Sequence, residues 1–174
     1  LPKTYIADVL FGQTSDTYDL EGKIEVNKNA KKFDLENLEK NLAKFLGEQE
    51  QQAPIYSAKK IGGQKLHKLA RAGKKVTAPT KKIEIYNLEI LDFEYPQAKI
   101  KVTASAGTYI RSLAHDLGQT LGMGALLADL RRTNIGDFDI NKALSLDKVT
   151  KQSLEQIKLD TAQVISSLDQ YYDQ

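Results

Sequence analysis

A tyrosine and an arginine stand together where an apolar, strand-like segment turns into a helix-like one. Residues 105–107 form a small-residue turn, and Tyr109 and Arg111 follow it directly. Apolar residues then recur at helical spacing, at Ile110, Leu113, Ala114, Leu117 and Leu121. The first turn of a helix is rigid and open to solvent, and a guanidinium group is a fixed fork for a carboxylate or a phosphate. This pattern predicts a place where the chain presents chemistry to a substrate.

Positive charge is concentrated in one block of the chain. Residues 51–83 contain no Asp or Glu, but they contain nine cations: Lys59, Lys60, Lys65, Lys68, Arg71, Lys74, Lys75, Lys81 and Lys82. The whole chain carries a net charge of +2, so the remaining residues carry −7. A localised basic patch is the electrostatic footprint of a polyanion partner, although a solvated lysine-rich face has the same composition.

Composition excludes several classes of protein. The 174 residues are enough for one domain or for part of a larger one. There is no cysteine, and the two histidines, His67 and His115, lie too far apart for a metal-ligand motif. No apolar run approaches the ~20 residues of a membrane span. We therefore expect a soluble, cytoplasmic protein without a metal site.

The elements that must position Tyr109 and Arg111 alternate irregularly between strand and helix. In order, the patterns predict a strand at 3–11, a helix at 35–46, an extended linker at 49–54, a short helix at 66–70, a hairpin of strands 83–91 and 98–104, a helix at 110–121, a short helix at 126–130 and a helical tail at 151–174. The alternation changes phase between Ile85 and Leu88, which indicates a bulge. Without a strict βαβ rhythm, the fold class is α+β, a mixed, largely antiparallel sheet flanked by helices.

Several ordered motifs between about residues 3 and 137 resemble one known family. They are Lys3-Thr4-Tyr5, Phe11-Gly12, Thr17 with Asp19, Glu21-Gly22, Pro54 to Lys60, Ala70 to Gly73, and S-x-G-T-Y-I-R at 105–111 with the D-L-G, L-G-x-G-A and L-R-R that follow. The set is similar to the TruB-type tRNA pseudouridine-55 synthases. The resemblance implies an incomplete pseudouridine synthase core over residues 1–150, with 51–82 as a basic RNA-docking insert. Residues 151–174, an acidic helical tail, match none of these motifs.

The resemblance also implies the chemistry. The T-loop uridine of tRNA, at tRNA position 55, is isomerised to pseudouridine without a metal or an organic cofactor, after the base leaves its stack. Arg111 would pair with the family's nucleophilic aspartate and lower its pKa. Tyr5 would stack on the target base, Tyr109 would contact that base and help to move its proton, and Leu130 would contact the substrate.

The remaining site residues implied by the resemblance bind RNA. They are Lys59, Lys60, Lys65, Lys68, Arg71, Lys74, Arg131 and Arg132. The partner is the T-arm of tRNA, no membrane is involved, and we expect a monomer.

The family's nucleophilic aspartate has no counterpart in this sequence. It lies in a Gly-Thr-Leu-Asp-Pro-like loop upstream of the Lys-x-Tyr strand, whereas this chain begins at Leu1. We therefore expect an amino-terminally truncated part of a larger enzyme, inactive alone. The alternative is a non-catalytic RNA-binding or tRNA-folding module, which an upstream aspartate in a G-x-L-D-P context would exclude. A third interpretation, a small ribosome-associated basic protein, leaves Tyr5, Tyr109 and Arg111 unexplained.

Replacing Lys65, Lys68 and Arg71 with glutamine tests the basic block. Each lost phosphate contact flattens the log–log salt dependence of RNA affinity by about 0.7–0.9, so we expect the slope to fall by about 2–3 units. The measurement is Kd against salt for tRNA and for an unrelated folded RNA, which should weaken equally. An unchanged slope would identify the block as a solvated face only.

Overall fold

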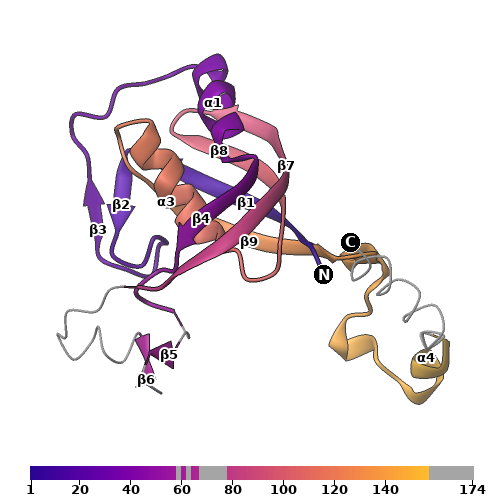
Figure 1. Cartoon of the computed structure of the whole chain (residues 1–174). Coiled ribbons are helices and arrows are strands. Elements are labelled where there is room, and N and C mark those ends of the chain that lie inside the picture. The colour runs from indigo at the N-terminus through magenta and orange to yellow at the C-terminus, as the bar shows by residue number, and fades with distance from the viewer. Residues whose placement is uncertain (58–59, 62–63, 67–77, 157–174) are drawn as a thin grey trace.

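A six-stranded sheet forms the centre of the chain (Figure 1). The computed structural model describes residues 1–57, 60–61, 64–66 and 78–156. The strand order is β10-β9-β1-β8-β7-β4, and every neighbouring pair is antiparallel. The strands are β1 (Lys3–Phe11), β4 (Gly47–Gln52), β7 (Thr80–Glu94), β8 (Gln97–Ala104), β9 (Ala125–Ile135) and β10 (Phe138–Asp139). The predicted α+β class with a largely antiparallel sheet is confirmed.

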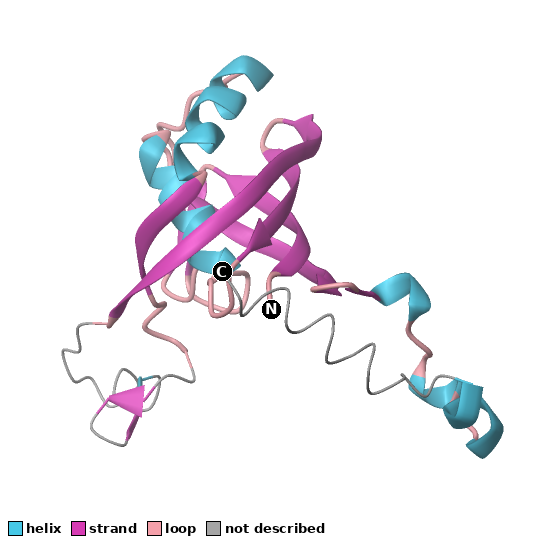
Figure 2. Cartoon of the chain, turned by 45° about the vertical axis from the view of Figure 1, so that its right-hand side comes forward, coloured by secondary structure: helices cyan, strands magenta, loops and turns pink. Residues whose placement is uncertain are grey.

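Two helices cover one face of this sheet, α1 (Leu35–Leu42) and α3 (Ile110–Thr120) (Figures 1 and 2). The alternation of β1 gives the reason. Ala7, Val9 and Phe11 are buried against the helices in a single apolar cluster, whereas the residues between them are part-exposed on the other face. Successive side chains of a strand point to opposite sides, so only one face of β1 belongs to the core.

Helix α1 begins where the sequence indicates, but it ends at Leu42, earlier than the predicted end at 46. The Asp34 side chain caps it by accepting the Asn37 N–H at 2.9 Å, which satisfies a backbone donor that the helix cannot. A short 3-10 turn (Ala43–Phe45) follows, and Gly47, with a φ of +89°, leads into β4. The shorter elements are β2 (Gln13–Ser15) and β3 (Ile24–Val26), which form a hairpin beside α3, β5 (Lys60–Ile61), β6 (Gln64–Lys65), the 3-10 turns Ile140–Lys142 and Leu146–Lys148, and α4 (Lys151–Gln156).

The predicted hairpin of β7 and β8 is present, and its register shifts between Ile85 and Asn87, which confirms the bulge. Two other predictions are wrong. The linker at 49–54 is largely the edge strand β4, paired with β7, and the short helix at 126–130 is part of the strand β9. Both segments pair with strands far away in the sequence, and short-range periodicity does not report such pairing.

Three further observations bear on the sequence-based expectations. The predicted short helix at 66–70 lies outside the described residues after Leu66, which is buried. The tail is described only through α4. In the part of the chain that the structure describes, no helix is long and apolar enough to cross a bilayer.

Helix α3 meets the start of β9 with almost no space between the two backbones. The carbonyl of Gly118 accepts the N–H groups of both Met123 and Gly124, at 3.1 and 3.0 Å. A β-carbon on Gly118 would fall inside contact distance of the Ala125 nitrogen and the Gly124 carbonyl carbon. Glycine at this position therefore sets how closely the helix that carries Arg111 approaches the sheet.

We expect Gly118→Ala to destabilise the protein, although alanine normally favours a helix by about 1 kcal/mol over glycine. The added methyl group must push α3 away from β9, and overpacking of this kind costs about 1–3 kcal/mol. Denaturant unfolding measures the change. Gln119→Ala, at the exposed next position of α3, is the control and should change stability by less than about 0.5 kcal/mol. A more stable Gly118→Ala variant would contradict the close approach.

Candidate active site

Arg111 is fixed by two loops that come from distant parts of the sequence. Its Nη1 donates to Oδ2 of Asp19 at 2.6 Å and to the carbonyl of Thr17 at 3.3 Å. Its Nη2 donates to the carbonyl of Tyr56 at 3.3 Å. The Arg111 and Asp19 side chains are 25% and 17% exposed, so the ion pair is only weakly screened by solvent. The guanidinium plane is thereby held in one orientation on the first turn of α3.

The loop that carries Asp19 is itself braced. Oδ1 of Asp19 accepts the Thr17 hydroxyl at 2.5 Å and the Glu21 N–H at 3.1 Å. The Leu127 N–H of β9 donates to the carbonyl of Tyr18 at 2.9 Å, which ties the loop to the sheet. Burial alone would raise the pKa of Asp19, but the hydrogen bonds from Thr17, Arg111 and Glu21 and the charge of Arg111 outweigh it and hold this pKa below its usual value.

A ring stack makes a second contact between this loop and α3. Tyr18 lies on His115 with ring centroids 3.9 Å apart and planes 14° from parallel. His115 is one helical turn after Arg111, so consecutive loop residues, Tyr18 and Asp19, contact successive turns of α3. Tyr18 has a φ of 65°, a conformation that residues other than glycine rarely adopt, and both contacts hold it there.

Burial lowers the pKa of His115, and the charge of Asp116 offsets this only in part. Its Nδ1 is buried and has no hydrogen-bond partner among the described residues. The neutral imidazole is therefore the favoured form in the stack.

The aromatic and apolar residues of the predicted site lie on the helix face of the sheet. Tyr5 follows the alternation of the buried β1 residues and packs against the core cluster. Leu130 is opposite Ala7 in the β1–β9 register and is 39% exposed, so it is available for contact. Directly opposed residues of antiparallel strands share a face. Tyr109 precedes α3 as its N-cap residue.

The register separates the two arginines that were predicted to bind phosphate. Arg132 is opposite Tyr5 and lies on the helix face, whereas Arg131 is opposite Ile6 and lies on the other face. Both are exposed. The structure therefore brings only Arg132 to the side of the sheet that holds Arg111.

Five of the nine cations of the basic block lie outside the described residues, namely Lys59, Lys68, Arg71, Lys74 and Lys75. Lys60 and Lys65 are opposite each other in the β5–β6 pair. The two ends of the predicted insert are in the sheet, because Gln51 pairs with Lys81 and Gln52 with Thr80. The chain from 53 to 79 thus leaves and rejoins the sheet at the same edge.

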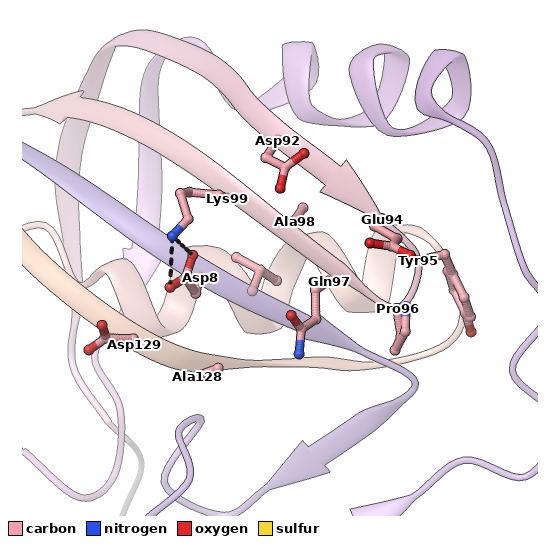
Figure 3. Close-up of a pocket in the computed structure, with 11 residues that line it drawn as sticks. Asp8, Asp92, Glu94, Tyr95, Pro96, Gln97, Ala98, Lys99, Ala128 and Asp129 are labelled. Carbon is pink, nitrogen blue, oxygen red and sulfur yellow. Dashed lines mark hydrogen bonds and ion pairs between the residues drawn. The ribbon is translucent and has the colours of Figure 1, made fainter.

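The opposite face of the sheet has an acidic pocket. A pocket of about 480 Å³ there is lined by four carboxylates and one amine, those of Asp8, Asp92, Glu94, Asp129 and Lys99 (Figure 3). Lys99 Nζ lies 3.1 Å from Oδ1 of Asp8, so its charge is already compensated. This acidic pocket is unsuited to a phosphate chain.

Sequence reasoning did not identify Asp19 as the partner of Arg111. Asp19 belongs to the Thr17-x-Asp19 motif, but that spacing alone predicts only an Asx-type turn. Its contact with a residue 92 positions later is a tertiary feature. No group of three or more His, Cys, Asp or Glu residues that could hold a metal occurs in the described segments.

Comparison with known proteins places this site in a family. A model described as the TruB family pseudouridylate synthase N-terminal domain matches residues 1–110, and one described as the tRNA pseudouridylate synthase B C-terminal domain matches residues 111–171. The chain belongs to the TruB family of pseudouridylate synthases. The second match also includes most of the tail that the motifs left outside the family.

Curated relatives named tRNA pseudouridine synthase B extend the match. The protein from Clostridium tetani is 38% identical over 98% of this chain and 61% of its own length. The protein from Francisella tularensis subsp. novicida is 46% identical over 88% of this chain and 51% of its own length. The chain thus spans between half and two thirds of the length of these relatives.

Solved structures support the fold. A chain in the crystal structure of a Cbf5-Nop10-Gar1 complex aligns with a TM-score of 0.56 and 25% identity, over 80% of this chain and 32% of that chain. A chain of an H/ACA RNP bound to a substrate RNA containing 2'-deoxyuridine aligns with a TM-score of 0.52 and 23% identity, over 80% and 30%, which is evidence for the fold alone.

The stack predicts how His115 titrates. The chain has two histidines, so His67→Gln leaves one imidazole signal in proton NMR, and we expect it to titrate below the ordinary value of about 6.5. Because the folded state favours neutral His115, its contribution to stability is complete above that value and declines as the pH falls below it.

Tyr18→Ala should raise the pKa of His115 toward its ordinary value, because the variant exposes the ring, whereas Tyr18→Phe should leave it low. A His115 signal that titrates at or above the ordinary value in the unmodified loop would contradict the buried stack.

Proposed function

We propose that this chain supplies the base pocket and the RNA-docking surface of a tRNA pseudouridine synthase, which isomerises the T-loop uridine at tRNA position 55. The single observation that carries the proposal is the fixed guanidinium of Arg111, in a chain of the TruB family. The names of the curated relatives support tRNA as the substrate.

The geometry leaves Arg111 able to bind a second anion. A guanidinium has five N–H donors, and the described residues accept three hydrogen bonds, two from Nη1 and one from Nη2. The Nε–H and one Nη2 hydrogen remain. A carboxylate at this edge would be kept ionised by the adjacent charge, as a nucleophile near the sugar or the base requires. Asp19 binds Nη1 and thereby fixes the orientation of the guanidinium.

Aromatic residues and charge favour RNA on the helix face. Tyr5 lies on this face of the sheet and Tyr109 at the start of α3, and an aromatic ring on which a base stacks is worth roughly 1–3 kcal/mol per base. Arg132 offers a phosphate contact on the same side. The acidic pocket lies on the opposite face, where it would repel the backbone of an RNA.

Arg111→Lys in the protein expressed from its complete reading frame tests the assignment. Lysine keeps the charge but loses the fork, so hydrogen bonds worth about 1.5–3 kcal/mol each are weakened. We expect kcat for pseudouridine formation to fall roughly 10- to 150-fold, with Kd for tRNA nearly unchanged. Chemical labelling of pseudouridine in unmodified tRNA measures kcat, and filter binding measures Kd.

Arg111→Gln, which also removes the charge, is the companion variant and should lower kcat further. Equal losses in kcat and affinity in the lysine variant would make Arg111 a phosphate clamp. If the unaltered protein binds tRNA but forms no pseudouridine, the non-catalytic RNA-binding module is the correct interpretation.

A further inference from the structure

One side chain of the polar edge strand β4 is buried. The strand reads Gly-Glu-Gln-Glu-Gln-Gln, and within it only Gln51 is buried, at 5% exposure, while Glu50 and Gln52 are exposed. Burial of a carboxamide costs free energy unless its donor and its acceptor both find partners. Gln51 therefore must be bonded within the fold.

Both partners of Gln51 belong to one residue of the candidate site. Its Oε1 accepts the Tyr109 N–H at 2.7 Å, and its Nε2 donates to the Tyr109 carbonyl at 3.0 Å. The side-chain amide thus pairs with the backbone of Tyr109 as a neighbouring strand would. Tyr109 is extended, with φ −95° and ψ 108°, and has no side-chain cap of its own.

Other contacts bring β4 and β7 to the same turn, but none of them holds Tyr109. Ser112 donates its hydroxyl to the carbonyl of Gln52 at 2.9 Å, and Lys81 donates to the carbonyl of Ala106 at 2.6 Å. β4 runs past the first turn of α3 (Figure 1). Among the described side chains, Gln51 is the one that bonds to the backbone of Tyr109, where the turn becomes a helix.

The chemistry of this pairing is specific to a carboxamide. A carboxylate at the same place has acceptors only, and it would face the Tyr109 carbonyl with a repulsive oxygen. A thioether of similar size would leave the Tyr109 N–H without its partner, while the Tyr109 carbonyl would keep only the Leu113 N–H of the helix. The carboxylate loses the donor half of the pairing and the thioether loses both halves, and neither changes the volume of the side chain greatly.

We propose that Gln51 is a positioning residue of this site, which fixes the backbone of Tyr109 and thereby the places of Tyr109 and Arg111 on the first turn of α3. The inference rests on the proposed function. Gln51 is a partner of protein backbone only, so its loss acts on the geometry of the reacting groups rather than on RNA affinity. A displacement of about 1 Å in such groups costs roughly 10²-fold in rate.

Gln51→Met and Gln51→Glu in the protein from its complete reading frame test the proposal. We expect kcat for pseudouridine formation to fall roughly 10- to 100-fold, with Kd for tRNA within about threefold, per folded molecule as counted by circular dichroism. Glu50→Met and Glu50→Gln are controls at the neighbouring, exposed position on the other side, and they should leave kcat unchanged. If Gln51→Glu does not fold, Gln51→Met decides.

A second readout separates this inference from the proposed function. In this chain, amide hydrogen exchange of Tyr109 should accelerate at least tenfold in Gln51→Met, while the amides from Ala114 to Leu117 exchange at unchanged rates. An inactive unaltered protein would overturn the proposed function but leave this exchange result standing. Any of three outcomes would overturn the positioning role. They are an unchanged kcat in both Gln51 variants, a loss of activity in proportion to a loss of folded protein, and a rise in Kd with kcat unchanged.

Discussion

Strand β1 pairs along its whole length with β8 on one side and β9 on the other, and this double pairing places every part of the candidate site. It puts Tyr5 opposite Val102 on one side and Arg132 on the other, and it fixes which face each neighbour occupies. Because β9 also holds the loop at Tyr18 and meets α3 at Gly118, the register of one strand determines where Asp19 and Arg111 can meet.

The ion pair of Arg111 and Asp19 shows how such a site balances opposing effects. Partial burial penalises both charges, and the mutual attraction compensates only when the remaining donors and acceptors are also satisfied. Here the Thr17 hydroxyl and the Glu21 N–H donate to the second oxygen of the Asp19 carboxylate. The carbonyls of Thr17 and Tyr56 accept hydrogen bonds from the guanidinium. The result is a guanidinium that the described residues fix by hydrogen bonds from Nη1 and Nη2.

The two faces of the sheet carry different kinds of side chain. The helix face carries the core, the aromatic residues and Arg111, whereas the other face carries the pocket that Asp8 and Asp129 line. Since β-strand side chains alternate, a single residue step separates Leu130 from Arg131 and assigns them to opposite faces. The carboxylates of this pocket oppose the approach of a polyanion to it.

The sequence by itself determined the elements whose signals are local. Asp34 marks a helix start, the phase change after Ile85 marks a bulge, and the residues around Tyr109 and Arg111 mark a strand-to-helix turn, because caps, alternation and turns are properties of a few adjacent residues. Only the tertiary structure decided that 126–130 is a strand, that Asp19 pairs with Arg111 and that Gln51 holds Tyr109. Each of these depends on a partner more than 50 positions away, and the free energy of such a pairing exists only once the sheet has formed.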